Sequence, residues 1–436
     1  MHQERERTFT RRGRFGVATV AIASAAGAMP AAANNGLNMI GFGTESIGMG
    51  GADVAVARDT AALNTNPAGI TQIKGPAFDG YAAVAYALDV AHSDSLGNDQ
   101  RVDNRYNVAG GFGYTAPIAP RLTAGIGMFA QGGAGNVYKN LQTPFGTRDE
   151  LSALIGFAKL APAIAWQATD ELSLAFSLPV AAITATQRVF PSTSALNPAN
   201  PAQSFFGLQL KDARGAGVGA KVGVLWRASP ALHLGATAAT KIRLPASDGY
   251  ANVNMSAVGL GVVRYDNARL DGFGLPPEIA LGAAWQATER VLVSAEVGWL
   301  GWSHALRTTT ITLSQPNNPT APQTLAQSAA IDARDQTVVA LGAAYAATGS
   351  LTLYGGINYG RSPIPPQNLT PLIAAIGETH LTAGFKQALA PGWSMSGALE
   401  YLLPRSVSYD NPSSPLGPST ERLSYIALHL MMSRRW

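Results

Sequence analysis

A pattern of short apolar runs, each ending on an aromatic residue and followed by a brief turn, repeats from Leu122 to Trp436. Within a run, apolar side chains alternate with small or polar ones, which is the period of a β-strand with one apolar face. The aromatic residues at positions 166, 226, 285 and 345 follow one another at intervals of 60, 59 and 60 residues. Such an interval corresponds to a pair of strands plus one long loop, so we expect consecutive β-hairpins.

The composition indicates that these strands face lipid. Hydrophobic residues make up 47% of the 436 residues and charged residues only 13%, whereas about 25% charged is usual in a water-soluble domain. Beyond the N-terminal leader, no run of about 18 apolar residues offers a transmembrane helix. A closed antiparallel barrel resolves this conflict, because its apolar residues occupy every second position and its ladder satisfies the backbone. A water-soluble sandwich would also alternate, but it would need a shared core rather than an aromatic rim.

The first 33 residues have the features of a cleaved secretory signal peptide: five arginines, an apolar stretch over 15–29 and alanines at 31–33. Removing residues 1–33 takes away five Arg and two Glu, so the formal charge falls from +4 to +1. A nucleic-acid partner is therefore not indicated. The chain contains no Cys, which excludes a disulfide framework and thiolate chemistry.

Phasing the alternation predicts fourteen strands over residues 76–436. Six short connections alternate with seven long ones, as expected for periplasmic turns and external loops, so both chain ends face the periplasm. Segments 186–212, 246–274 and 305–335 are the longest expected external loops and are rich in Pro, Asn and Ser. Residues 34–75 are too apolar for a solvated tail, so we interpret them as a plug inside the lumen; a flexible periplasmic tail is the alternative.

The same phasing assigns side chains to the two faces of the barrel wall. In the last strand, Leu428 and Leu430 are assigned to lipid and the residues between and beside them to the lumen. Glu296, Glu400 and Lys221 fall in the inward phase of their strands. We therefore expect charged side chains inside the barrel.

Three stretches carry a likeness to a known family. They comprise Gly48-Met49-Gly50-Gly51-Ala52 leading to Asn64 through Ile70, then Leu275-Pro276-Pro277-Glu278 leading to Trp302-Ser303, and finally Ser362 through Asn368. The first resembles the N-terminal hatch of the FadL-type outer-membrane transporters of long-chain fatty acids and other hydrophobic compounds. The resemblance implies a monomeric, fourteen-stranded barrel with a hatch over residues 34–75 and a barrel over residues 76–436.

The resemblance also implies a route, in which substrate is captured at external loops, reaches an apolar pocket and leaves sideways at a kink in the third strand. Gly132 and Gly133 follow the third run and permit a break in the ladder, although they could equally begin an external loop. Asn66, Pro67 and Ala68 are expected to fix a local turn of a plug that shifts for release. A plain turn accounts for them equally well, because Pro67 restricts Asn66 to extended geometry.

Few residues suggest chemistry. Arg188 and Arg307, at the external ends of the fifth and ninth strands, are candidates for contact with a carboxylate head group, with solvated loop charge as the alternative. His92, Ser93 and Asp94 supply the residue types of a catalytic triad, but neighbours in sequence rarely converge as one. No His or carboxylate cluster has metal-ligand spacing. We therefore expect neither an enzyme nor a cofactor or metal.

Together these features predict a multi-pass channel in the outer membrane of a Gram-negative bacterium, surrounded by lipid and lipopolysaccharide. Its expected function is passive, ligand-gated uptake of hydrophobic small molecules such as long-chain fatty acids. A general diffusion porin with an aqueous lumen is the first alternative, and a lipid-acting barrel enzyme is the second. Fatty acids, alkanes and aromatic hydrocarbons all suit the same apolar lining, so the sequence leaves the substrate open.

Overall fold

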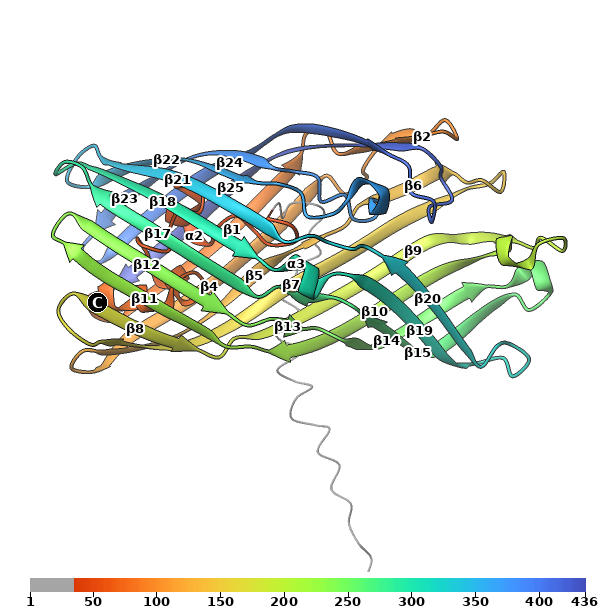
Figure 1. Cartoon of the computed structure of the whole chain (residues 1–436), viewed down its shortest axis with the longest axis horizontal. Helices are drawn as coiled ribbons and strands as arrows, with labels where there is room; N and C mark the ends of the chain where they lie inside the picture. The colour runs from red at the N-terminus through yellow and green to blue at the C-terminus, as the bar shows by residue number, and fades with distance from the viewer. Residues whose placement is uncertain (1–34) are drawn as a thin grey trace, which may run out of the picture.

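A closed antiparallel β-barrel dominates the computed structural model, which describes residues 35–436 (Figure 1). Fourteen strands form the wall, and the first pairs with the last, from Ala77↔Arg435 to Ala87↔Tyr425. The short turns gather at one end of the barrel together with the C-terminus, and the long hairpins gather at the other end (Figure 1). The predicted all-β barrel and its strand count are confirmed. The predicted signal peptide, residues 1–33, lies outside the described residues.

Several wall strands are interrupted, so that two or three consecutive elements make up one wall strand. The first half of the chain contains β1 (Ala77–Ala87), β2 (Ala91–Asp94), β3 (Asp99–Arg101), β4 (Tyr106–Ala119), β5 (Leu122–Ala134), β6 (Val137–Gln142), β7 (Arg148–Gln167), β8 (Leu172–Ser177), β9 (Val180–Ala195), β10 (Phe205–Val218) and β11 (Lys221–Ser229). The second half contains β12 (Leu232–Ala239), β13 (Ile242–Arg243), β14 (Ala246–Asn254), β15 (Val262–Asp271), β16 (Gly274–Leu275), β17 (Glu278–Gln286), β18 (Val291–Leu300), β19 (Thr308–Pro316), β20 (Thr324–Ala330), β21 (Gln336–Ala346), β22 (Leu351–Gly360), β23 (Thr379–Ala390), β24 (Trp393–Tyr409) and β25 (Ser419–Arg435).

Helical structure is confined to short segments. These are α2 (Gly43–Gly48), α3 (Trp302–Ala305) and the 3₁₀ helices η1 (Thr60–Leu63), η2 (Pro67–Gln72), η3 (Pro201–Gln203), η4 (Ser256–Val258) and η5 (Pro366–Asn368). Within residues 35–436, none of the helices has both the length and the apolar character needed to cross a membrane.

The two faces of the wall follow the period of two in the sequence. In β25, Leu428 and Leu430 are half-exposed on the outside, and Ala427 and His429 are buried inside. Exposed aromatic residues end the strands at the short-turn rim, as is usual at a membrane interface. They include Trp166, Trp226, Trp285 and Trp393. The alternation predicted from the sequence is therefore the alternation of lipid and lumen.

The prediction that 186–212, 246–274 and 305–335 are long external loops is wrong. The hairpins β9–β10, β14–β15 and β19–β20 occupy most of these segments and extend the wall outward (Figure 1). Proline and asparagine are present at the tips, for example Pro198 between β9 and β10 and Pro319 between β19 and β20, but they also occur within strands, as at Pro191 in β9. The Pro, Asn and Ser residues gave each segment the composition of a loop, so the strands within it were not predicted.

The plug lies inside the barrel, where α2, η1 and η2 pack against the inner face of the wall (Figure 1). Buried apolar residues of the plug, including Phe42, Leu63 and Ile70, form one cluster with Phe129 of β5. A second, larger apolar cluster fills the external half of the lumen and includes Tyr138. The plug thus separates the external half of the lumen from the short-turn end.

Candidate functional site

Residues 66–68 lie where the plug meets the wall. Pro67 takes the first position of η2, where its missing N–H costs no helical hydrogen bond. Asn66 caps this helix by accepting the amide N–H of Ala68 at 3.1 Å. The Asn66 side chain also donates to the backbone oxygens of Val54 at 2.7 Å and of Val224 in β11 at 3.0 Å. Asn66 therefore joins two parts of the plug to the wall, which a plain turn would not require.

Two charged wall residues, Glu296 and Lys221, bond to backbone groups of the plug. Glu296 on β18 accepts the amide N–H groups of Asp53 and Val54 at 3.0 and 2.9 Å, and Lys221 on β11 donates to the Asn64 carbonyl at 2.7 Å. Both side chains face the lumen, as their phase predicted. Burial raises the pKa of Asp53 to about 6, so this carboxyl group is protonated more readily than in water, which reduces its repulsion with Glu296.

The third wall strand, β5, is kinked. Its pairing with β4 stops at Gly111↔Phe129, and its register with β7 shifts between Ala130 and Gly132. Residues 132–134 nevertheless continue to pair with β7. They therefore belong to a bent strand rather than to the start of an external loop, which decides between the two alternatives that the sequence left open.

Beyond the kink, β5 bonds to the plug in place of β4. The Gly133 amide donates to the Leu37 carbonyl at 3.0 Å, and the Met39 amide donates to the Gln131 carbonyl at 3.2 Å. Gly132 and Gly133 have φ values of +148° and +157°, a conformation that favours glycine. A Cβ atom on Gly132 would overlap the Leu37 carbonyl oxygen. Glycine is thus required both by the bend and by the close approach of the plug.

A polar cavity of about 110 Å³, which we call the central chamber, lies between plug and wall. Its charged lining residues are Asp53, Lys159, Lys221, Glu278 and Glu296. Four buried asparagines also line it, and their side-chain oxygens have no hydrogen-bond partner within residues 35–436: Asn35, Asn38, Asn64 and Asn358. Buried polar groups normally find a partner in protein or water. The chamber is therefore suited to water or to a polar group of a ligand.

An apolar cavity of about 160 Å³, which we call the external cavity, lies in the outer half of the lumen. It is enclosed by β7, β9, β10, β15, β19, β20 and the segment 364–373, and its lining includes Ile155, Val189, Leu210 and Ile311. Within the described chain no Lys or Arg lines it. Its surface therefore suits an uncharged apolar ligand.

A narrow opening, which we call the wall slot, lies where β4 has lost its neighbour. It is bounded by Met39 of the plug, by parts of β1 and β4, and by Glu400, Ala427 and His429. Val108 of β4 lines it and is 61% exposed on the outer surface, so the slot reaches the lipid side of the wall. Met39 lines both the slot and the central chamber. This side chain therefore separates the two spaces.

The two arginine candidates lie near the external cavity but do not line it. Arg188 on β9 forms an ion pair with Glu150 at 2.7 Å, and it alternates with Gln187 and Val189, which line the cavity. Arg307 lies between α3 and β19 and is exposed. Within residues 35–436 its guanidinium group has no ion-pair partner. The structure thus brings neither of them to the plug or to the kink at Gly132.

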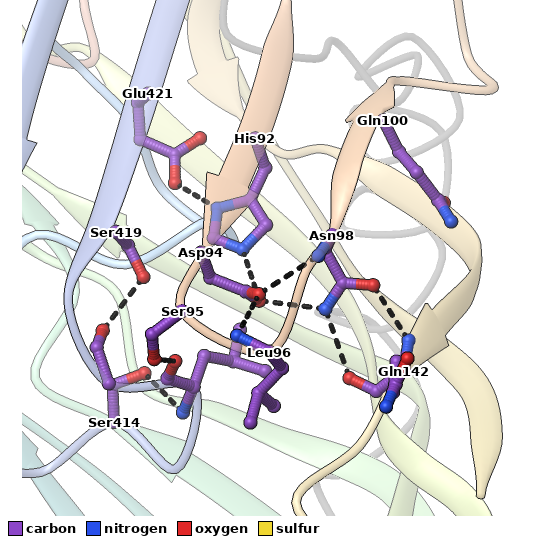
Figure 2. A network of polar contacts seen from close by, with 12 residues as sticks. His92, Asp94, Ser95, Leu96, Asn98, Gln100, Gln142, Ser414, Ser419 and Glu421 are labelled. Atoms are coloured by element: carbon purple, nitrogen blue, oxygen red, sulfur yellow. Dashed lines mark hydrogen bonds and ion pairs between the residues drawn. The ribbon is translucent and has the colours of Figure 1, made fainter.

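The His92 region forms a structural network rather than a triad. Figure 2 shows His92 between two carboxylates, with Nδ1 2.6 Å from Glu421 and Nε2 3.0 Å from Asp94. In the described part of the chain no hydrogen bond joins Ser93 to His92. Nor does any group of three or more His, Asp or Glu among residues 35–436 form a candidate metal site. His92 instead holds the hairpin β2–β3 against β25.

Two lumenal features were missed by the sequence argument. Lys159 is 5% exposed in the middle of β7 and lines the central chamber. A lysine within the otherwise apolar run over residues 153–166 was the available signal. Glu400 was assigned to the lumen, but its partners His380, Tyr425 and His429 come from the two neighbouring strands, β23 and β25. Only the register between those strands brings them together.

A closed barrel with an apolar exterior, an internal plug and enclosed cavities defines a plugged membrane channel. The family model described as outer membrane protein transport protein (OMPP1/FadL/TodX) matches residues 17–426. The chain therefore belongs to this family of hydrophobic-compound transporters, and its place is the outer membrane of a Gram-negative bacterium. No curated protein sequence matches it significantly.

Solved structures share the fold. The toluene transporter TodX of Pseudomonas putida has a TM-score of 0.74 at 20% identity, with 91% of this chain and 99% of that one covered. The toluene transporter TbuX of Ralstonia pickettii has a TM-score of 0.72 at 20% identity, with 92% and 99% covered. A FadL homologue of Pseudomonas aeruginosa has a TM-score of 0.73 at 16% identity, with 92% and 99% covered. At these identities the likeness establishes the architecture alone.

Proposed function

We propose that the protein mediates passive uptake of hydrophobic small molecules, and that substrate binding in the external cavity is coupled to a shift of the plug. The observation that carries this proposal is the external cavity, an apolar space of about 160 Å³ above a plug that closes the lumen. Burial contributes about 25 cal/mol per Å² of apolar surface. An apolar molecule would therefore bind there without any charged contact.

The proposed route runs from the external cavity past the plug to the wall slot. Gly132 and Gly133 would act as the gate, because the kink leaves β4 without a neighbour and lets plug residues 37–39 take its place. Asn66, Pro67 and Ala68 would act as the fixed point about which the plug shifts. This assignment is supported by the bonds of Asn66 to both plug and wall.

Long-chain fatty acids are one substrate class that the resemblance suggests, and neutral hydrocarbons are the other. The cavity lining favours the neutral class, because no Lys or Arg among the described residues lines it. Arg188 is a weaker head-group candidate, since Glu150 already pairs with it. Arg307 is the better one, because Thr309, two residues further along, lines the cavity. TodX and TbuX are themselves described as toluene transporters.

We also propose that residues 34–75 act as the hatch of a barrel formed by residues 76–436, and that the protein works as a monomer surrounded by lipid and lipopolysaccharide. The pairing of β1 with β25 supports a monomer, because the wall closes without a second copy. Light scattering of the detergent-solubilised protein measures this directly. A mass of two or three chains per particle would contradict the monomer.

The porin alternative requires an open aqueous lumen. The plug and its anchors Glu296 and Lys221 argue against it. Deleting residues 34–75 should raise conductance in planar bilayers, whereas an already open pore would change little. The enzyme alternative has no support from the family, which is a family of transport channels.

Uptake of labelled toluene by cells that lack their own hydrophobic-compound channel tests the proposal. The variant Ile311→Trp fills the external cavity and should reduce uptake at least tenfold. Ile357→Trp is the matched control, because Ile357 is a half-exposed residue on the lipid face of β22. Equal loss in both variants, or no uptake by the wild-type protein, would contradict the proposal.

A further inference from the structure

Among the described residues that line the wall slot there is one carboxylate, Glu400, and no Lys or Arg. We propose that Glu400 sets the charge selectivity of the wall slot, so that neutral apolar molecules pass and carboxylate anions of the same size are excluded. This inference rests on the proposed function and adds a residue that determines substrate class. It concerns the exit in the wall and not the external cavity.

The slot offers few contacts other than apolar ones. Its floor is formed by small side chains in register across neighbouring strands, where Ala85 of β1 lies opposite Asn107 of β4 on one side and Ala427 of β25 on the other. Glu400 of β24 is the register partner of Ala427. A molecule that passes from Met39 to the gap beside β4 therefore moves along an alanine surface with Glu400 at its inner end.

Glu400 is held firmly in this position. It is 4% exposed, accepts the hydroxyl of Tyr425 at 2.7 Å and contacts Nε2 of His429 at 3.1 Å. Nδ1 of His380 lies 2.8 Å from Oε1 of Glu400, the same oxygen that accepts the Tyr425 hydroxyl. These partners come from β23 and β25, so they fix the carboxylate from both sides.

The charge of the cluster follows from this composition. The ionised carboxylate of Glu400 carries one negative charge, and no Lys or Arg among the described residues lines the slot to offset it. Charges act over longer range in an apolar surrounding than in water, because the effective dielectric constant is lower. A carboxylate entering the slot would be repelled by Glu400, whereas a neutral ring would meet a mostly apolar lining without charge repulsion.

The chain contains a second cluster of the same chemistry that lies outside the slot. Glu421 on β25 is 1% exposed and contacts Nδ1 of His92 at 2.6 Å (Figure 2). It also accepts the Tyr409 hydroxyl at 3.0 Å. It does not line the slot. Glu421→Gln therefore reproduces the loss of a buried, histidine-bound carboxylate without changing the charge of the slot.

The test compares uptake of toluene and benzoate, a neutral and an anionic molecule with one ring each, at pH 8, where imidazoles are in general uncharged. We expect the wild-type protein and Glu421→Gln to admit toluene and exclude benzoate. Glu400→Gln should raise benzoate uptake at least tenfold and leave toluene uptake within twofold. Benzoate exclusion that persists in a folded Glu400→Gln barrel would overturn the inference.

A second variant covers the case in which Glu400→Gln does not assemble. Asn107→Lys adds a positive charge to the lining of the slot and leaves Glu400 in place, and it should also admit benzoate. Benzoate uptake unchanged by Asn107→Lys would count against the charge filter. If the wild-type protein admits no toluene, the proposed function itself fails; if it admits toluene and benzoate equally, only the filter fails.

Discussion

Replacing Gly132 by alanine should loosen the plug where it meets the kink of β5. An L-residue held at the φ of +148° seen here costs about 1–3 kcal/mol. The added Cβ would displace the Leu37 carbonyl and break its hydrogen bond with the Gly133 amide, which is 3.0 Å long and contributes roughly 1 kcal/mol. Local opening of residues 37–39 should thus become easier by about 2–4 kcal/mol.

Hydrogen–deuterium exchange of the detergent-solubilised protein measures this change. Each 1.4 kcal/mol is about a tenfold change in an opening equilibrium, so protection at residues 37–39 should fall by roughly 30-fold or more. Gly355→Ala is the matched control, because a Cβ at Gly355 in β22 meets nothing within 4 Å. If Gly132→Ala exchanges at the wild-type rate while its barrel remains folded, the kink does not depend on glycine and the reasoning is refuted.

Three further predictions concern the plug and its surroundings. Asn66→Ala removes the cap of η2 and the hydrogen bonds to the backbone oxygens of Val54 in the plug and Val224 in the wall. The local stability of η2 should fall by about 1–3 kcal/mol, which would be measured as faster amide hydrogen exchange over residues 66–72. Burial, together with the nearby carboxylates of Asp79 and Glu45, raises the pKa of Asp59 to about 7 from 3.8. Because the folded plug binds this proton more tightly than the unfolded chain, the stability of the plug should fall as pH rises from about 4 to 7. Amide hydrogen exchange in the plug, corrected for intrinsic rates, should therefore be faster at pH 8 than at pH 5. In Asp59→Asn the exchange rates at the two pH values should be equal. Trp302→Ala empties a fully buried site and should cost about 3–5 kcal/mol, lowering the temperature at which the barrel unfolds in a heat-modifiability gel; a temperature equal to that of Trp302→Phe would contradict this.

The strands and their faces were predictable because they depend on local order along the chain. The alternation around Leu428 places one face in lipid whatever the neighbouring strand is. The same reasoning placed Glu296, Glu400 and Lys221 in the lumen. It failed for the hairpin β19–β20, because turn residues at the tip hid the pairing of the strands beside them.

The candidate site was less predictable, because its contacts join residues far apart in the chain. Gly132 was singled out by its composition, but its bent strand became evident only from its pairing with β7 and its approach to Leu37. Arg188 was chosen by position at a strand end, and its ion pair with Glu150 depends on the register of β7 with β9. Position in sequence identifies a charged residue but not its partner.

What the amino-acid order determined by itself was a membrane-embedded barrel, since a period of two and a scarcity of charge leave few other ways to satisfy the backbone in lipid. Only the tertiary structure decided where the cavities of the lumen and the slot in the wall lie. The kink, the cavities and the Glu400 cluster arise where the plug and separate strands meet. Such spaces are set by the register between strands and the packing of the plug, and neither is encoded in the alternation of any single strand.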